Sequence, residues 1–508
     1  MQHEEMIKIL VEAIAHHKAG RIAEAEPLYR QVLEYSPQTP TALQNLALIL
    51  SKMGKRDEAI EFLRKSIEIE PNIALFHRNI GSVYRGAERN QEAVEALRRA
   101  VNLAPADGLC WADLGVSLDR AGYLVEAMAV YEKAIRLLTP IVTPAQPADP
   151  MPIDGSPTME LGRAHYNLGC TWSRLNNIPG AMTEYENSLR ILPNFPEAHR
   201  NRAGVLFSRG QMAEAWVEYE WRWRCEDYPG KFPDFRQPRW DGSDLSDKTI
   251  LIWWEQGFGD TIQFCRYAPL LSARGARVVL LCQNEMRRLL QTLNGPAEIV
   301  VSGEKKVTFD THASLMSLPA LFKTSLETIP PGTAYLHADP KDSAAWENRL
   351  AGDGPGLRVG LVWAGAAAHK QDLQRSIPLA AFAPILRIPN VQFYTLQLGG
   401  PNKQLQNLPA GRVVDHTAYI KDFADSAAFI DRLDVLITVD TAPAHLGGAI
   451  GKETWLLLPF EPEFRWMNDT ENPSRWYPTV RLFRQTSPGD WKSVIERVAK
   501  EVVLRTEC

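Results

Sequence analysis

The chain has 508 residues, of which 45% are hydrophobic and 23% are charged, and its formal net charge is −5. This balance is typical of globular proteins and excludes a disordered polymer, while the length exceeds what one hydrophobic core usually serves. We therefore expect two to four domains. The slightly acidic total argues against nucleic-acid binding, because such proteins usually carry a basic surface.

The amino-terminal segment carries Glu4 and Glu5 where a secretory signal would carry lysine or arginine, and its apolar residues follow helical spacing. No apolar run in the sequence reaches the length that a membrane-spanning helix needs. The six cysteines are scattered and include no Cys-x-x-Cys pair, which argues against a zinc site and against a disulfide framework. We expect a cytoplasmic protein with free thiols, no bound metal and no cofactor.

Residues 1–225 repeat a pattern with a period of 34 residues. A small residue is followed by an alanine, then by a large side chain and then by a proline, at constant spacing. Small residues let paired helices approach closely, and the proline ends the second helix of each pair. The pattern resembles the tetratricopeptide consensus and predicts an all-α solenoid of six helix-pair repeats. The recurring alanines are Ala25, Ala59, Ala93, Ala127, Ala181 and Ala215.

A proline-rich insertion at residues 139–160 separates the fourth and fifth repeats, and we expect it to form an exposed loop. The concave surface of such a solenoid suits an extended peptide or a partner helix. A protein or peptide partner is therefore the first interpretation of the array. A spacer or an oligomerisation arm is the alternative.

The periodicity changes after a connector at residues 226–248 that is rich in proline, aspartate and tryptophan. Strand-sized apolar runs then alternate with helical segments, which predicts parallel sheets with right-handed crossovers. The alternation pauses near residues 338–356, so we expect two Rossmann-like lobes, at residues 249–340 and 356–508. In this architecture ligands bind at the carboxyl ends of the strands.

The first candidate site follows the first of these strands. Residues 255–260, here called the glycine turn, contain Gly257 and Gly259 and lead into a predicted helix. Glycine permits close approach of the backbone to a ligand, and a helix N-terminus favours a negative group. Asp260 is a candidate general base at this position, and a plain helix cap is its alternative interpretation.

The second candidate site follows a buried strand of the second lobe. Thr441 and the first amides of the next helix are candidates to hold a diphosphate, Asp440 could bond a ribose hydroxyl, and His445 lies one helical turn further on. An earlier loop carries Lys370 and Arg375, which form a candidate phosphate clamp. A solvated charged loop is the alternative interpretation of that segment.

A fourth stretch, at residues 456–485, mixes arginines, Arg465 among them, with aromatic residues. Such a mixture can stack on a base or sugar and can clamp phosphate. It is equally suited to packing between domains, and we favour packing as its role.

The motifs at residues 257–260 and 440–446 together resemble bacterial proteins that fuse tetratricopeptide repeats to a domain like the ADP-heptose heptosyltransferases. This resemblance implies a GT-B-type pair of Rossmann-like lobes, the first on the acceptor side and the second on the nucleotide-sugar side. It also implies that Asp260 is the catalytic base. The residues that it assigns to the donor are Asp440, Thr441 and His445 for the nucleotide, with Lys370 or Arg375 for the phosphates.

One position departs from that family, because Ala442 stands where its members usually have glycine. The order of repeats and lobes also looks like O-GlcNAc transferase and bacterial flagellin glycosyltransferases, whose repeats present protein acceptors. The expected activity is thus transfer of a sugar from a nucleotide-diphosphate donor to an acceptor, and the repeats are expected to recruit that acceptor as a protein or peptide.

This chemistry needs a base for the acceptor hydroxyl and cationic or backbone donors for the leaving diphosphate. No Asp-x-Asp follows a predicted strand, so a metal-bridged donor is not indicated. Two alternatives stay open. One is a non-catalytic repeat scaffold with a degenerate transferase domain, and the other is a nucleotide-sugar epimerase on a similar two-lobed fold.

Overall fold

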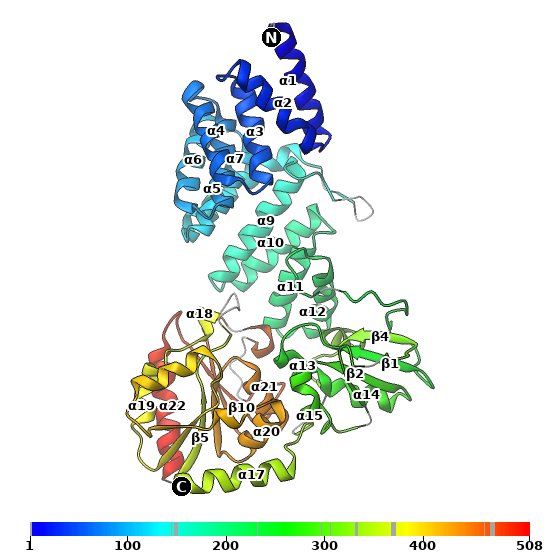
Figure 1. Ribbon diagram of the computed structural model, residues 1–508, viewed down its shortest axis with the longest axis vertical. Helices are drawn as coiled ribbons and strands as arrows, with labels where there is room; N and C mark the ends of the chain where they lie inside the picture. The colour runs from blue at the N-terminus through cyan, green and yellow to red at the C-terminus, as the bar shows by residue number, and fades with distance from the viewer. Residues whose placement is uncertain are drawn as a thin grey trace. The chain divides into compact units, whose positions relative to one another are not determined.

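The computed structural model describes residues 3–143, 145–146, 151–230, 232–295, 297–304, 306–330, 334–366, 372–461, 463–467 and 473–507 (Figure 1). Contacts divide the chain into two compact units, Met1–Arg202 and Ala203–Cys508.

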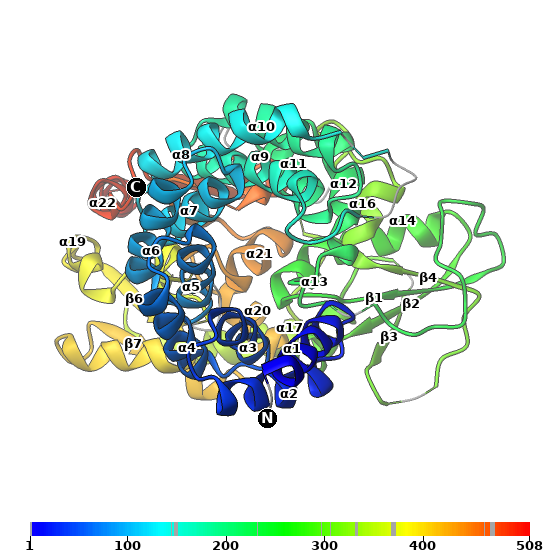
Figure 2. The same cartoon turned by 90° about the horizontal axis from the view of Figure 1, so that it is seen from above.

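The first unit consists of helices that pack in consecutive pairs, and each pair also contacts the next one along the chain (Figure 2). This arrangement confirms the predicted all-α solenoid. The helices are α1 (His3–Lys18), α2 (Ile22–Tyr35), α3 (Pro40–Lys52), α4 (Arg56–Ile69), α5 (Ala74–Gly86), α6 (Asn90–Leu103), α7 (Gly108–Arg120), α8 (Leu124–Leu138), α9 (Pro157–Arg174) and α10 (Ile178–Ile191).

The repeated small residues explain how the helices of a pair come so close. A Cβ added to Gly81 on α5 would lie 2.6 Å from Cγ of Leu97 on α6. One added to Gly169 on α9 would lie 2.8 Å from the Tyr185 ring on α10. These two glycines of the 34-residue pattern therefore each receive a large side chain of the partner helix, and the recurring alanines of the pattern are fully buried.

The proline-rich insertion ends earlier than its composition indicated. Helix α9 begins at Pro157, inside the expected loop at residues 139–160. The Ser156 hydroxyl accepts a hydrogen bond from the Met159 amide, and proline is tolerated in a first helical turn. Pro157 thus lies in the first turn of a helix, where proline is tolerated, although proline usually interrupts the interior of a helix.

The end of the predicted repeat array belongs to the second unit. Helix α11 (Pro196–Ser208) crosses the division between the units, and α12 (Met212–Tyr219) lies beyond it. Trp216 of α12 is 1% exposed, and its ring centroid lies 5.7 Å from that of Phe264 and 6.4 Å from that of Trp476. Aromatic contacts with the α/β region explain why this helix clusters there, although we expected the array to run to residue 225.

The strands of the second unit form two separate sheets, and every paired strand is parallel to its neighbour. The predicted parallel sheets are therefore confirmed. The first sheet has the order β3-β2-β1-β4, with β1 (Thr249–Trp253), β2 (Arg277–Cys282), β3 (Glu298–Val301) and β4 (Thr311–Ser314). The second has the order β10-β9-β8-β5-β6-β7, with β5 (Leu357–Val362), β6 (Val391–Thr395), β7 (Val413–Asp415), β8 (Val435–Val439), β9 (Thr454–Leu458) and β10 (Val480–Arg484).

Helices connect these strands, as parallel order requires. Those that follow strands of the first sheet are α13 (Phe258–Phe264), α14 (Ala268–Ala273), α15 (Arg287–Leu290) and α16 (Leu318–Leu321). Those on the side of the second sheet are α17 (Pro340–Leu350), α18 (Asp372–Arg375), α19 (Ala383–Leu386), α20 (Phe423–Asp431), α21 (Ala442–Ala449) and α22 (Trp491–Thr506).

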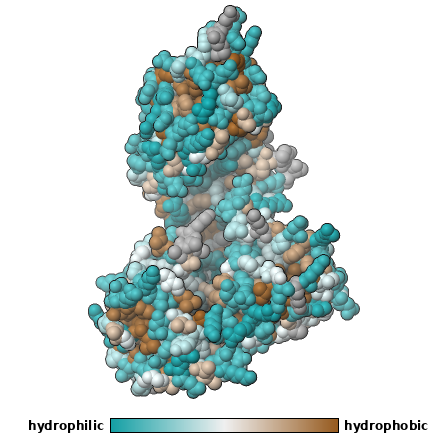
Figure 3. Space-filling view, in the orientation of Figure 1, coloured by the Kyte–Doolittle hydropathy of each residue, from teal (hydrophilic) through white to brown (hydrophobic). Residues whose placement is uncertain are grey.

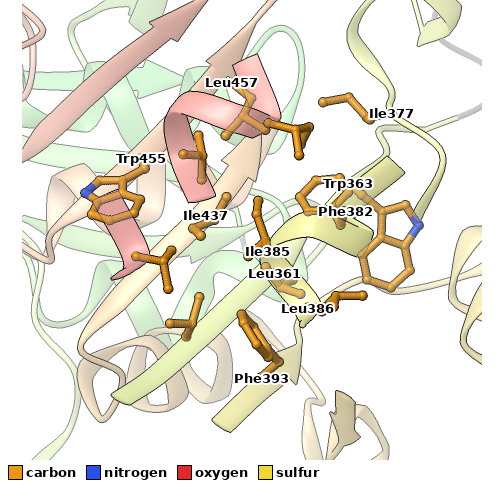
Figure 4. Close-up of a cluster of buried hydrophobic side chains, with 14 of the residues drawn as sticks. Leu361, Trp363, Ile377, Phe382, Ile385, Leu386, Phe393, Ile437, Trp455 and Leu457 are labelled. Atoms are coloured by element: carbon orange, nitrogen blue, oxygen red, sulfur yellow. The ribbon is translucent and has the colours of Figure 1, made fainter. Parts of the chain in front are cut away.

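A hydrophobic core covers one face of the second sheet (Figure 4). Leu361, Ile437 and Leu457 contribute from three neighbouring strands. Phe382 contributes from just before α19, and Ile385 contributes from α19 itself. All five side chains are at most 1% exposed, and burial of each such side chain contributes about 1.5–3 kcal/mol. This core holds the carboxyl ends of the strands in fixed positions.

Two arginines join the sides of the two sheets. Arg266, which follows α13, is 4% exposed and donates hydrogen bonds to the Trp476 carbonyl at 3.0 Å and to the Tyr335 hydroxyl at 3.1 Å. Arg288 on α15 is exposed and pairs with three carboxylates on the side of the second sheet. Those carboxylates belong to Asp342, Asp422 and Asp425.

The face of the molecule shown in Figure 3 is mostly hydrophilic, with small hydrophobic patches among the hydrophilic residues. Among the residues that the structure describes, no helix combines the length and apolar character needed to span a bilayer. Five cysteines are described, and all are free thiols, as expected. The cytoplasmic location stays a prediction.

Candidate functional site

A pocket of about 690 Å³ lies in the second unit at the carboxyl ends of strands from both sheets. Segments that follow β1, β5, β6, β8 and β9 all contribute to its lining. This is where parallel α/β architectures bind ligands. The pocket brings together Gly257, Gly259, Asp260, Arg375, Asp440, Thr441 and His445. Lys370, the remaining candidate from the sequence, lies outside the described residues.

Asp260 has two partners, one for each carboxylate oxygen. Its Oδ2 accepts a hydrogen bond from the Gly257 amide at 2.9 Å, at the start of α13. Its Oδ1 forms an ion pair with Arg465 at the wall of the pocket. Helix capping therefore accounts for one oxygen, while the other points to a charged partner within the pocket.

Gly259 lines the pocket and also makes room for a side chain of a neighbouring helix. A Cβ added there would lie 2.8 Å from Cδ2 of His445, on helix α21 beside the second sheet. The missing side chain lets α13 pack directly on α21. Gly257 is less constrained, because the nearest atom to an added Cβ would be Asp260 Oδ2 at 3.5 Å.

The glycine turn is also held from the side of the last helices of the repeat array. The Gln256 amide donates to the Tyr219 hydroxyl at 3.3 Å and to the Tyr228 hydroxyl at 2.7 Å. Glu255 forms a fully buried ion pair with Arg222, in the 3-10 segment η2 (Glu220–Arg224) that follows α12. Removing one member of a buried pair leaves an uncompensated charge, so this contact strongly constrains the turn.

His445 is a buried and neutral imidazole. Burial, together with the nearby positive charges of Arg465 and Arg266, holds its pKa well below the usual value. Its Nδ1 lies 3.0 Å from the Tyr477 hydroxyl. A neutral imidazole has one donor and one acceptor nitrogen, so Tyr477 fixes the ring while Nε2 keeps the opposite role for a ligand.

Thr441 begins α21 in an extended conformation, with φ −149°. Its hydroxyl donates to the Val439 carbonyl at 3.2 Å instead of capping the amides of α21. Asp440 precedes it, and burial raises the pKa of the Asp440 carboxyl while Arg465 and Arg375 oppose that rise. The carbonyl of Asp440 accepts a hydrogen bond from Arg375 Nη1 at 3.0 Å.

Gly365, in the loop after β5, makes room for Arg375. A Cβ added to Gly365 would lie 2.6 Å from Arg375 Nη2 and even closer to Asp372 Oδ1. The Ser376 hydroxyl accepts from the Gly365 amide at 3.0 Å and donates to Asp372 at the same distance. These hydrogen bonds hold the loop and α18 together, so the segment that carries Arg375 is fixed beside the pocket.

Arg465 and Glu463 also line the pocket, although the sequence favoured a packing role for Arg465 and assigned none to Glu463. They lie in and next to the 3-10 segment η10 (Phe464–Trp466), after β9. Arg465 pairs with both Asp260 and Glu463, and its guanidinium lies 4.4 Å from the centre of the Phe464 ring. Burial lowers the pKa of Arg465, but the two carboxylates raise it more. Burial raises the pKa of Glu463 to about 7, against the lowering effect of Arg465. A signal was present, since Arg465 follows the carboxyl end of an apolar strand.

Charged residues of both signs line the pocket. The acidic ones are Asp260, Glu285, Asp422, Asp440, Glu461 and Glu463, and the basic ones are Arg375, Lys421 and Arg465. Carboxylates accept hydrogen bonds from hydroxyl groups, while arginines bind phosphate and carboxylate groups in a forked geometry. The arrangement therefore suits an anion that also carries hydroxyl groups.

Comparison with known proteins identifies the repeats. Models of the tetratricopeptide repeat match residues 16–78 and 78–147. Protein FlbA of Caulobacter vibrioides is 26% identical over 423 residues, which are 77% of this chain and 66% of that protein. This chain thus spans just under two thirds of the length of that relative.

The comparison with solved structures finds repeat proteins that are similar to part of the chain. A MamA protein is 21% identical, covers 37% of this chain and 92% of its own, and has a TM-score of 0.31. TTC0263, a thermophilic TPR protein of Thermus thermophilus, is 17% identical, covers 40% of this chain and 98% of its own, and has a TM-score of 0.31. YrrB, described as a TPR protein with an unusual peptide-binding site, is 19% identical, covers 37% and 88%, and has a TM-score of 0.30. The family models confirm that the amino-terminal part of this chain carries tetratricopeptide repeats, as its 34-residue period predicted.

Proposed function

We propose that the second unit is a metal-independent glycosyltransferase that moves a sugar from a nucleotide-diphosphate donor to an acceptor hydroxyl. One observation carries the proposal. Asp260, at the carboxyl end of a first-sheet strand, faces the same pocket as Arg375, Thr441 and His445, at the carboxyl ends of second-sheet strands. A base and a set of anion-binding groups on opposite sides of one pocket are what transfer from a diphosphate requires.

The donor fits the side of the second sheet. Arg375 is held in place by its hydrogen bond to the Asp440 carbonyl. Thr441 begins a helix whose N-terminus favours negative charge. The neutral ring of His445 adds a hydrogen-bonding nitrogen beside them. Together these groups offer charge stabilisation to the departing diphosphate without a metal ion.

The pocket also has an apolar part. The rings of Phe258 and Phe423 lie 4.8 Å apart between their centroids, and Ile420 and Leu398 line the same region. Flat apolar surfaces suit the face of a nucleobase or the carbon face of a sugar. This supports a ligand that joins a ring system to a charged diphosphate.

The acceptor is the least constrained part of the proposal. The resemblance to heptosyltransferases supports a GT-B arrangement with the acceptor on the side of the first sheet. The tetratricopeptide repeats support a protein or peptide acceptor, because an extended polypeptide can lie along a solenoid of helix pairs. A tethered acceptor would reach an effective concentration of about the millimolar range at the pocket.

The test is calorimetric titration of the full chain with UDP, GDP, CDP and ADP, followed by hydrolysis assays with sugar derivatives of whichever diphosphate binds. Binding of one diphosphate with a dissociation constant in the micromolar range is expected, as is slow release of that diphosphate from its sugar derivative. Absence of binding to all four would overturn the proposal. Product formation without any acceptor, and with the diphosphate bond intact, would instead indicate an epimerase.

A non-catalytic binding scaffold is the second candidate, and one observation favours it. Both oxygens of Asp260 are engaged, one by the Gly257 amide and one by Arg465. A carboxylate that only caps a helix and holds an ion pair would not act as a base in the reaction. In that case the full chain would bind its partner through the repeats but would not turn over any nucleotide sugar.

A further inference from the structure

Arg465 holds a position that a purely structural arginine does not need. Its guanidinium joins Asp260, which follows β1, to Glu463, which follows β9. The side chain is 9% exposed and yet lines the pocket. Its Nε is buried and has no hydrogen-bond partner among the described residues. The fork of the guanidinium is therefore only partly used by the protein itself.

The ion pair conflicts with the role proposed for Asp260. A guanidinium that contacts a carboxylate oxygen occupies the place from which a hydroxyl group would approach it, and Arg465 contacts Asp260 Oδ1 in this way. The second oxygen of Asp260 is already bound by the Gly257 amide. Movement of Arg465 away from Oδ1 would open that oxygen of Asp260 to an acceptor hydroxyl.

The pocket offers Arg465 a second kind of partner. Arg375 also lines the pocket, but its Nη1 is already bonded to the Asp440 carbonyl. If Arg465 stayed on Asp260, Arg375 would be the one arginine among the described lining residues left to bind a diphosphate. A diphosphate carries two or more negative charges, and a guanidinium binds phosphate oxygens in a bidentate manner. An arginine with an unused Nε, next to a proposed diphosphate site, is suited to complete the charge balance.

We infer that Arg465 moves from Asp260 to the donor diphosphate when the donor binds, and that this exchange releases Asp260 to act as the base. The inference rests on the proposed function. In the transfer step the acceptor oxygen forms a bond to the anomeric carbon while the bond from that carbon to the diphosphate oxygen breaks. The hydroxyl proton passes to Asp260, and the nucleoside diphosphate leaves with the bonding electron pair, next to Arg465 and Arg375.

Glu463 is suited to keep Arg465 in the pocket during this exchange. It pairs with the guanidinium and also accepts a hydrogen bond from the Arg465 amide at 3.1 Å. The second contact is local and does not depend on where the guanidinium points. Glu463 therefore acts as a positioning residue, while Asp260 and the diphosphate compete for the remaining face of Arg465.

Competition between Asp260 and the diphosphate for Arg465 predicts how substitutions change the affinity for the diphosphate. Asp260→Asn removes the charge that holds Arg465, while the amide oxygen can still accept from the Gly257 amide. The full-length variant should therefore bind the nucleoside diphosphate about 3- to 10-fold more tightly than the wild type. Arg465→Met should weaken binding by about 10-fold or more, and the double variant should show no gain from Asp260→Asn. Arg481→Met, which breaks an exposed pair with Glu501 outside the pocket, should leave binding unchanged.

Calorimetric titration of these full-length variants with the diphosphate that binds the wild type tests the inference. If Arg465→Met does not fold, the single Asp260→Asn variant still decides the question, since its cap is retained. Equal affinity of Asp260→Asn and wild type would overturn the exchange while leaving the donor site in place. If the wild type binds none of the four diphosphates, the proposed function fails and the inference fails with it.

Discussion

Gly259 and the imidazole of His445 are in direct contact between helix α13 and helix α21, and no side chain larger than hydrogen fits between them. The two helices begin at the ends of strands that belong to different sheets. Their contact therefore sets the distance between the base and the anion-binding groups of the pocket.

Gly259→Ala tests this contact. The added Cβ would lie 2.8 Å from Cδ2 of His445, so one of the two helices must shift. Overpacking of this kind costs about 1–3 kcal/mol, and we expect a corresponding fall in the free energy of unfolding together with weaker diphosphate binding. Urea denaturation and calorimetry measure both quantities. Gly257→Ala is the matched control, because its Cβ meets only Asp260 Oδ2, at 3.5 Å. Equal effects of the two substitutions would contradict the assignment.

Asp260→Asn tests the base. Asparagine keeps the oxygen that accepts from the Gly257 amide but cannot take up a proton from the acceptor. Turnover should fall by roughly 10²–10⁴, while the melting temperature changes little. The measurement is the initial rate of transfer or of donor hydrolysis at saturating donor. Wild-type turnover in this variant would reduce Asp260 to a helix cap and an ion-pair partner.

Glu463→Gln tests the protonation of the pocket. Burial raises the pKa of Glu463 to about 7, and the charged groups around it are Arg465, Asp440 and Asp260. Between its ordinary value near 4.5 and about 7, the folded protein keeps a proton that the unfolded chain releases. The free energy of unfolding must therefore fall as the pH rises through this window, and glutamine removes that fall.

The side chain of Glu463 is 30% exposed, so solvent screening reduces the effect to roughly 1–2 kcal/mol. Relative to wild type, Glu463→Gln should gain about that much stability between pH 5 and pH 8, as measured by urea denaturation. Glu501→Gln is the control, because its hydrogen bond from Arg481 lowers the pKa of Glu501 instead of raising it. Parallel stability curves for wild type and Glu463→Gln would disprove the shift.

Trp216→Ala tests where the second unit begins. Trp216 lies on α12 yet contacts Phe264 and Trp476 of the α/β region. Its loss should destabilise that unit by about 3–5 kcal/mol. For the same reason, a protein that starts at Lys248 should be unstable, whereas one that starts at Ala203 should fold and keep diphosphate binding. Equal stability of the two truncated proteins, measured by thermal unfolding, would show that α12 is dispensable.

Much of the fold follows from local patterns in the sequence. The small residues at the 34-residue period predict the close helix pairs, and the structure places Leu97 and Tyr185 against two of them. The alternation of strands and helices along the chain predicts parallel sheets. A helix between two strands returns the chain to the edge of the sheet where the first strand began, so the two strands run in the same direction. The pocket at the carboxyl ends of the strands follows from the same topology.

The contacts that define the site were harder to predict. Asp260 and Arg465 are 205 positions apart, and nothing in the local sequence of either residue indicates the other. The contact of Gly259 with His445 also joins distant segments, so the local sequence indicated only that a ligand could approach this glycine closely. The grouping of α12 with the second unit was not predicted for a similar reason, since α12 has the periodicity of a repeat but makes aromatic contacts with that unit.

The two arginines that join the sides of the sheets differ in their response to the medium. Arg266 is buried among aromatic rings and carbonyl groups, where dissolved ions do not reach it. Arg288 is exposed and binds its three aspartates by interactions that dissolved salt weakens, because the Debye length falls from about 10 Å at 0.1 M to about 3 Å at 1 M. Rising ionic strength thus weakens the attachment at Arg288 and leaves the one at Arg266 intact. Asp422 lines the pocket, so the attachment that depends on salt concentration is the one that holds a residue of the pocket wall.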